Sequence, residues 1–306
     1  MKLIGLMPVR NEAYCLGLTL RAALMWCDEM VVYCHACTDD SYKIARDVMV
    51  ECVKVGPSRV WITESQDSNW NEMEHRQHML CHARAMGATH IAIVDADEIP
   101  TGNLSAGLCP IREIVRGMPK GSCLQLPMYQ LRGSLDRYHS NGIWGNRWLS
   151  VAFQDDPRLS WSGDTFHSRE PGGMALKPYR PIQHGQGGSF HLWGVSERRL
   201  RAKHALYKVT ERLRWPAKPI LDIERMYNLW RSAEDGYAHN HGRYGDPWTY
   251  ADVPAEWWAP YADLAKYLYI GQYGLDLVTW QEAEVRRLVA EHGAEAFKGL
   301  DLFGVA

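Results

Sequence analysis

Apolar stretches of strand length alternate with helical stretches over the first 126 residues of the chain. The strand-like runs, four to seven residues long, cover residues 3–9, 30–34, 60–63, 90–94 and 122–126. The segments with helical spacing cover residues 12–26, 41–52 and 71–86. Because these strands are continuously apolar, they are typical of a mainly parallel sheet that helices cover on both faces. The pattern therefore predicts an α/β fold.

The pattern becomes irregular after residue 126, which suggests a division of the chain into three parts. Residues 1–126 form the sheet region, and residues 127–214 contain many Gly, Trp and His residues, strands around 148–153 and a helix at 196–214. Two prolines after that helix break it, so residues 215–306 are expected to form a helical appendage.

Three carboxylates follow the apolar run 90–94 within four residues: Asp95, Asp97 and Glu98, here called the carboxylate cluster. Ligands of parallel α/β sheets bind at the carboxyl ends of the strands, where this cluster is expected. Like charges so close together repel one another unless they meet water or a cation, and hard oxygen ligands suit Mg²⁺ or Mn²⁺.

The helix predicted at 71–86 places Arg76 in the middle of its apolar arc, with Glu72 one turn away. A buried guanidinium needs an anion. Either Glu72 satisfies Arg76 structurally, or both face a site that holds phosphate or carboxylates. Three histidines of this helix resemble metal ligands by spacing, but they fall opposite the arc, where a solvated face is expected: His75, His78 and His82.

Composition narrows the class of protein. With 34 basic and 36 acidic residues, the chain is not expected to coat nucleic acid, although a local patch is possible. No apolar run reaches the roughly 20 residues that a membrane span needs, and the start of the chain lacks a signal-peptide core. The eight cysteines lie in or beside apolar segments, which predicts reduced thiols in a cytoplasmic protein. Most of the 13 Trp and 15 Tyr residues follow residue 125, which fits either an aromatic core or a site for sugars or bases.

Three motifs in order, MPVRNE at 7–12, TDDS at 38–41 and IVDADE at 93–98, resemble the family 2 glycosyltransferases. This family has the GT-A fold and uses nucleotide-sugar donors. The resemblance implies that residues 1–126 bind the donor and 127–214 bind metal and acceptor. Asp95 and Asp97 would correspond to the Asp-x-Asp motif that holds Mn²⁺ or Mg²⁺. The implied nucleotide-sugar contacts are Pro8, Arg10, Glu12, Asp39, Asp95, and Arg76 behind them. The segment around Asp39 lacks the glycine that is common in the second motif.

The resemblance also implies a third metal ligand and a phosphate contact from the second half. His191 matches the position of the histidine ligand, with His184 and His167 as alternatives. Lys203 matches a recurring lysine and could reach the diphosphate or a polyanionic acceptor, as could Arg198 and Arg201; the alternative is a solvated helix face.

Transfer with inversion at the anomeric carbon needs a carboxylate that takes the proton of the acceptor hydroxyl. Asp164 is the candidate base, because it lies among aromatic and small residues that suit a sugar pocket. The alternatives are Asp155, Asp156 and Glu197.

These observations predict a metal-dependent glycosyltransferase with a nucleotide-sugar donor, expected to be a uridine diphosphate sugar. The acceptor would be a glycan, a protein or a hydroxylated DNA base. One alternative is a nucleotidyltransferase, although residues 9–12 do not form the glycine-rich loop of that class. The other is a non-catalytic module that binds a nucleotide or a glycan.

Overall fold

The chain forms two compact units in the computed structural model, which describes residues 1–57, 59–164, 168–228, 248–268 and 279–306. The first unit comprises Met1–Tyr129, Asn146–His191 and Pro254–Tyr269, and the second comprises Gln130–Gly145, Leu192–Val253 and Ile270–Ala306. Within the described ranges, no helix has the length and apolar character that crossing a membrane requires.

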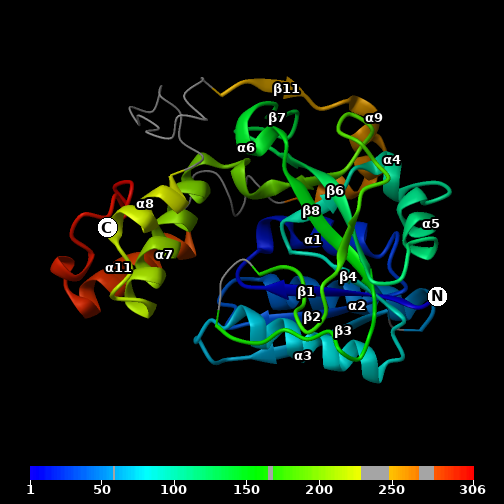
Figure 1. The fold of residues 1–306 in the computed structure, drawn as a ribbon, viewed down its shortest axis with the longest axis horizontal. Helices are drawn as coiled ribbons and strands as arrows, with labels where there is room; N and C mark the ends of the chain where they lie inside the picture. The colour runs from blue at the N-terminus through cyan, green and yellow to red at the C-terminus, as the bar shows by residue number, and fades with distance from the viewer. Residues whose placement is uncertain (58, 165–167, 229–247, 269–278) are drawn as a thin grey trace. The chain divides into compact units, whose positions relative to one another are not determined.

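The first unit is built on a mixed sheet with the strand order β3-β2-β1-β4-β8-β6-β10-β5, and β9 pairs with β6. The part of this order from β3 to β6 can be followed by the labels in Figure 1. Strands β1 to β4 are parallel to one another, whereas β8 runs antiparallel to both β4 and β6. The strands are β1 (Leu3–Val9), β2 (Glu29–His35), β3 (Val60–Ser65), β4 (His90–Ile93), β5 (Glu98–Pro100), β6 (Ser122–Gln130), β8 (Trp148–Gln154), β9 (Lys177–Tyr179) and β10 (Ser189–His191).

Helices cover both faces of the parallel strands. Leu3 and Met7 of β1 join the core beneath α1 (Ala13–Ala23) and α2 (Ser41–Val55). Ile4 and Leu6 point to the opposite face, where they join the core beneath α3 (Glu72–Ala85). Successive side chains of β1 are buried on opposite faces of the sheet, which explains why its sequence is continuously apolar. The structure thus confirms the predicted fold class, a mainly parallel α/β sheet with helices on both faces.

Some short elements of the first unit were not expected from the sequence. Strand β5 begins at Glu98, inside the carboxylate cluster, and pairs with β10. The other helical elements of this unit are α4 (Gly102–Ser105), α5 (Pro110–Arg116), α9 (Ala255–Trp258) and the 3₁₀ helix η3 (Ala259–Tyr267). All eight cysteines are free, as predicted, and Cys81 is the one in the exposed class.

The second unit is largely helical. Helix α7 (Glu197–Arg214) starts where Ser196 accepts a hydrogen bond from the backbone N–H of Arg199 at 3.3 Å, and it ends before the predicted break. It packs against α11 (Trp280–His292) through an apolar core that includes Val209 and Val285. The remaining elements are α6 (Gly142–Gly145), η1 (Leu192–Gly194), α8 (Ile220–Tyr227), η4 (Ala294–Phe297) and the antiparallel pair β7 (Arg137–His139) and β11 (Tyr250–Asp252).

Candidate donor and metal site

The carboxylate cluster lies in the turn between β4 and β5, at the carboxyl edge of the parallel strands. The turn is tight, because the backbone N–H of Glu98 donates to the carbonyl of Asp95 at 3.0 Å. Asp97 and Glu98 are 5% and 4% exposed, so two of the three acids are buried. Buried carboxylates are stable only when cations or hydrogen-bond donors compensate their charge.

Two arginines hold the carboxylate of Asp95, one at each oxygen. The Arg76 Nη2 atom lies 2.9 Å from Asp95 Oδ1, and the Arg169 Nη1 atom lies 2.8 Å from Asp95 Oδ2. Arg76 also donates from Nε to Glu72 at 3.0 Å. Both alternatives for Arg76 therefore apply: its guanidinium pairs with Glu72, and it also faces the carboxylate cluster.

Arg169 is the main residue of this site that the sequence did not reveal. Its Nη1 and Nη2 atoms donate to Glu98 at 2.9 and 2.6 Å, and Nη2 also donates to the Ile93 carbonyl at 2.8 Å. Its Nε atom donates to the carbonyl of Ser150. Such a planar fork can hold two carboxylates at once, which a lysine could not do with the same geometry. The signal in the sequence that could have indicated it was the negative charge of the cluster, because the single positive charge of Arg76 does not balance three carboxylates.

Asp97 faces a histidine. The Nε2 atom of His191 lies 3.4 Å from Asp97 Oδ2. This proximity follows from the strand register, since His191 of β10 pairs with Glu98 of β5, the residue next to Asp97. Of the three predicted metal ligands, Asp97 and His191 are thus brought together, while Asp95 pairs with the guanidiniums of Arg76 and Arg169.

Asp97 and His191 fit a divalent ion that a nucleotide brings with it. In the part of the chain that the structure describes, no three His, Cys, Asp or Glu side chains are grouped to hold a metal ion. Mg²⁺ sites commonly use only one or two carboxylates together with substrate phosphates and water, and imidazole is an acceptable ligand for transition metals such as Mn²⁺. The donor set therefore suits shared coordination rather than an all-protein cage.

The electrostatics of the site follow from burial and pairing. Burial alone would raise the pKa of Asp95, but Arg76 and Arg169 hold that pKa below its ordinary value. Burial raises the pKa of Glu98, and Arg169 opposes this rise. Among the described residues, the guanidiniums of Arg76 and Arg169 pair with the carboxylates of Glu72, Asp95 and Glu98.

The first and second motifs meet beside this site through Asn11 and Asp39. The Asn11 side-chain oxygen accepts from the backbone N–H groups of Thr38 and Asp39 at 2.7 and 3.1 Å. Asp39 accepts from the backbone N–H groups of Ala13 and Ser41 at 3.0 and 2.9 Å. Both carboxylate oxygens of Asp39 therefore bind backbone at the starts of α1 and α2. This bonding does not exclude a further contact with a nucleotide, which stays a prediction.

Two imidazoles form a second buried group at the same sheet edge, here called the imidazole cluster (His35 and His75). Their ring centroids lie 4.3 Å apart, and His75 also stacks on Tyr33 at 4.7 Å. Burial, with His35 and Arg10 nearby, lowers the pKa of His75 to about 4. The expectation of a solvated face is wrong for His75, which is 7% exposed, because the arc of α3 that meets the sheet is wider than the apolar residues alone indicate.

The other predicted residues have diverse settings. Pro8 and Arg10 are half-buried and Glu12 is buried around the end of β1. Asp164 is exposed, just before the undescribed residues 165–167, and the alternative ligand His167 lies outside the described residues. The alternative base Asp155 makes a two-pronged ion pair with Arg84 at 2.8 and 2.9 Å, a structural role. In the first unit, His184 packs against Trp148, and Asp156 pairs with Arg158. Lys203 and Glu197 lie in the second unit, where Glu197 pairs with Arg132 and Arg201.

Comparisons with known proteins return structural neighbours only. No family model matches the chain, and no curated protein matches it. A mannosyltransferase from Pyrobaculum calidifontis in complex with GDP-Man and Mn²⁺ aligns with a TM-score of 0.39 at 14% identity, over 97% of this chain and 81% of that chain. Glucosyl-3-phosphoglycerate synthase from Mycobacterium tuberculosis, in complex with Mn²⁺, UDP and phosphoglyceric acid, aligns with a TM-score of 0.29 at 12% identity, over 42% and 43% of the two chains. The first neighbour belongs by name to the predicted class, but with TM-scores below 0.5 the function of this chain is argued from its own residues.

Proposed function

We propose that the chain is a metal-dependent glycosyltransferase that moves a sugar from a nucleotide-sugar, with a uridine diphosphate sugar as the expected donor, to an acceptor hydroxyl. The observation that carries the proposal is the pairing pattern of the carboxylate cluster. Arginines pair with Asp95 and Glu98, while Asp97 and His191, two side chains of types that ligate metals, lie 3.4 Å apart at the carboxyl edge of the sheet.

In this proposal, Asp97 and His191 hold Mn²⁺ or Mg²⁺. When bound, the ion neutralises charge on the departing diphosphate. Asp95, fixed by Arg76 and Arg169, presents a rigid carboxylate edge to the nucleotide-sugar. Lys203 of the second unit is proposed as the residue that binds the diphosphate.

The first and second motifs are assigned to the nucleoside. Pro8, Arg10 and Glu12 line the end of β1, and Asp39 lies in the adjoining loop. Backbone and side-chain groups from two strand ends can read a base and ribose without a metal, because the required contacts are hydrogen bonds and van der Waals contacts.

The chemical step is proposed as a displacement with inversion. The acceptor oxygen forms the new bond to the anomeric carbon as the bond from that carbon to the diphosphate oxygen breaks. Asp164 takes the acceptor proton, and the electron pair of the broken bond leaves with the diphosphate. The exposure of Asp164 allows access of a macromolecular or oligomeric acceptor.

Thermal stability measured with a panel of nucleotide-sugars, with and without Mn²⁺, tests this function. A donor of the class should raise the melting temperature only when Mn²⁺ is present, by mass action on the folded state. Incubation with that donor should then release a nucleoside diphosphate. Pyrophosphate release from a nucleoside triphosphate would instead support a nucleotidyltransferase, and metal-dependent binding without turnover would support the non-catalytic module. Absence of any metal-dependent stabilisation across the panel would overturn the proposal.

A further inference from the structure

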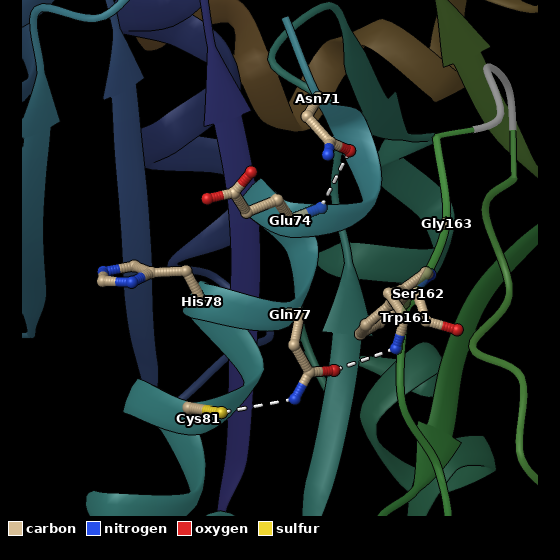
Figure 2. A pocket seen from close by; sticks show the side chains of 8 residues that line it. All are labelled: Asn71, Glu74, Gln77, His78, Cys81, Trp161, Ser162 and Gly163. Carbon is tan, nitrogen blue, oxygen red and sulfur yellow. Dashed lines mark hydrogen bonds between the residues drawn. The ribbon is translucent and has the colours of Figure 1, made fainter.

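A groove crosses the outer side of α3, away from the carboxylate cluster. It has a volume of about 470 Å³, within the range of small-ligand sites. Figure 2 shows α3 with Gln77 pointing to the segment 161–163, while Glu74 and His78 extend from the other side of the helix. The lining residues are Asn71, Glu74, Gln77, His78, Cys81, Trp161, Ser162 and Gly163.

Internal hydrogen bonds hold the middle of this groove in place. The side-chain oxygen of Gln77 accepts from the backbone N–H of Trp161 at 2.8 Å, and its nitrogen lies 3.3 Å from the Cys81 sulfur. Asn71 accepts from the backbone N–H of Glu74 at 3.2 Å and thereby caps the helix. The groove is therefore pre-formed, which lowers the conformational cost of binding.

The chemistry of the lining favours an uncharged ligand rich in hydroxyl groups. Amide, hydroxyl and carboxylate groups can each exchange hydrogen bonds with sugar hydroxyls. Trp161 is 3% exposed and packs against Phe153 in the apolar core, so it anchors residues 161–163 beside α3. Among the described lining residues there is no lysine or arginine, and Glu74 would repel the phosphates of a nucleic acid.

We propose that this groove between α3 and residues 161–163 is a carbohydrate-binding site for a neutral oligosaccharide. This inference rests on the proposed transferase function, because it selects a glycan from the three acceptor classes that the sequence left open. The groove adjoins the segment that carries Asp164, because the lining residue Gly163 directly precedes that proposed base.

Cys81 provides a built-in reporter, since it is the exposed cysteine and lines the groove. The rate of alkylation of Cys81 by iodoacetamide should be measured by mass spectrometry without donor or metal. The probes are the hexasaccharides maltohexaose, cellohexaose, mannohexaose and chitohexaose, and a 12-nucleotide DNA as single strand and duplex. One hexasaccharide should slow alkylation about fivefold when present at four times its dissociation constant.

The variant Glu74→Lys separates the ligand classes. For a hydroxyl-rich neutral ligand it removes a charged acceptor, and the affinity should fall about tenfold. For DNA the same change should increase the affinity. Asp47→Lys on α2, at the opposite face of the sheet, is the matched control and should leave protection unchanged.

The outcomes decide the proposal. Protection by a hexasaccharide that Glu74→Lys weakens supports it. Protection by DNA alone, or no protection by any probe at millimolar concentration, overturns it. This assay contains neither donor nor metal. If no glycan protects Cys81 but the donor still raises the melting temperature in Mn²⁺, the groove proposal fails and the transferase proposal stands. If a glycan protects Cys81 but no donor raises the melting temperature in Mn²⁺, the transferase proposal fails and the groove proposal stands.

Discussion

Two consecutive residues of α3 end in opposite electrostatic states. Arg76 enters the carboxylate cluster, where Asp95 and Glu72 raise its pKa further above the ordinary value although burial alone would lower it. His75 enters the imidazole cluster, where burial and nearby cations lower its pKa to about 4. Both side chains are buried. The difference lies in their partners: a buried charge persists where opposite charges meet it and is lost where they do not.

The partners also differ among the residues of the carboxylate cluster. Asp95 and Glu98 are held by guanidiniums, whereas Asp97 has His191 as its neighbour at 3.4 Å. If a metal ion displaced the arginines, the carboxylates of Asp95 and Glu98 would lose their partners. An imidazole, by contrast, can ligate a metal ion through the lone pair of a ring nitrogen. Under the proposed function, the cluster is therefore divided into a structural half and a ligand-binding half.

Removing Arg169 should break the structural half and produce the largest effect. Arg169→Ala leaves the buried Glu98 carboxylate and one oxygen of Asp95 without their cation, and we expect a loss of about 3–5 kcal/mol in the free energy of unfolding. Urea unfolding at pH 7 measures it. Arg169→Lys should recover only part of the loss, because an ammonium lacks the fork.

Arg158→Ala is the matched control for that experiment. Arg158 belongs to the same irregular segment and also pairs with a carboxylate, Asp156, but it is 67% exposed. Exposed ion pairs contribute little to stability, because water screens them. Equal effects of the two alanine variants would show that Arg169 does not hold the buried carboxylates.

Asp97→Asn should affect function instead of stability. The amide keeps the shape but ligates a divalent ion poorly, so we expect transfer or donor hydrolysis in Mn²⁺ to fall about hundredfold or more. Without metal, the variant should lose much less stability than Arg169→Ala, because the amide keeps the shape of the carboxylate. A variant that retains Mn²⁺-dependent donor stabilisation would remove Asp97 from the metal site.

The neutral state of His75 predicts a specific pH dependence. Below pH 6.5 the unfolded chain binds a proton at this histidine while the folded chain does not until about pH 4, so stability is lost as the pH falls through this window. The difference in pKa is worth on the order of 2 kcal/mol after allowance for solvent screening. His75→Phe should flatten the dependence of unfolding free energy on pH between 6.5 and 4, whereas His78→Phe at an exposed position should not. Equal slopes in wild type and His75→Phe would contradict the low pKa.

The sequence predicted the features that depend on local periodicity. The parallel strands, the three long helices and the inward position of Arg76 all follow from residues within a few turns of one another. Asp95 and Asp97 could be placed because a strand that ends in carboxylates must deliver them to the sheet edge.

The features that escaped prediction depend on long-range pairing. Arg169 meets Asp95 across 74 positions of sequence, from a segment without helix or strand periodicity. Arg158, in the same segment, gives the same signal in the sequence and stays at the surface. Strand β5 is only three residues long and exists because β10 pairs with it. Such choices are fixed by the folded arrangement and not by local propensity.

The smallest predicted effect concerns Asp39, for which two roles can be separated. If its carboxylate mainly caps the starts of α1 and α2, Asp39→Asn should lose one of two acceptor contacts and reduce the free energy of unfolding by about 1 kcal/mol, with donor affinity unchanged. If Asp39 also binds the nucleotide, the donor-induced shift in melting temperature in Mn²⁺ should shrink as well. Asp40→Asn is the control, because the Asp40 side chain makes no capping hydrogen bond at the start of α2. A loss of donor affinity in Asp39→Asn that exceeds the loss of stability would place Asp39 with Asp97 in the ligand-binding part of the sheet edge, and an unchanged affinity would place it with Arg169 in the structural part.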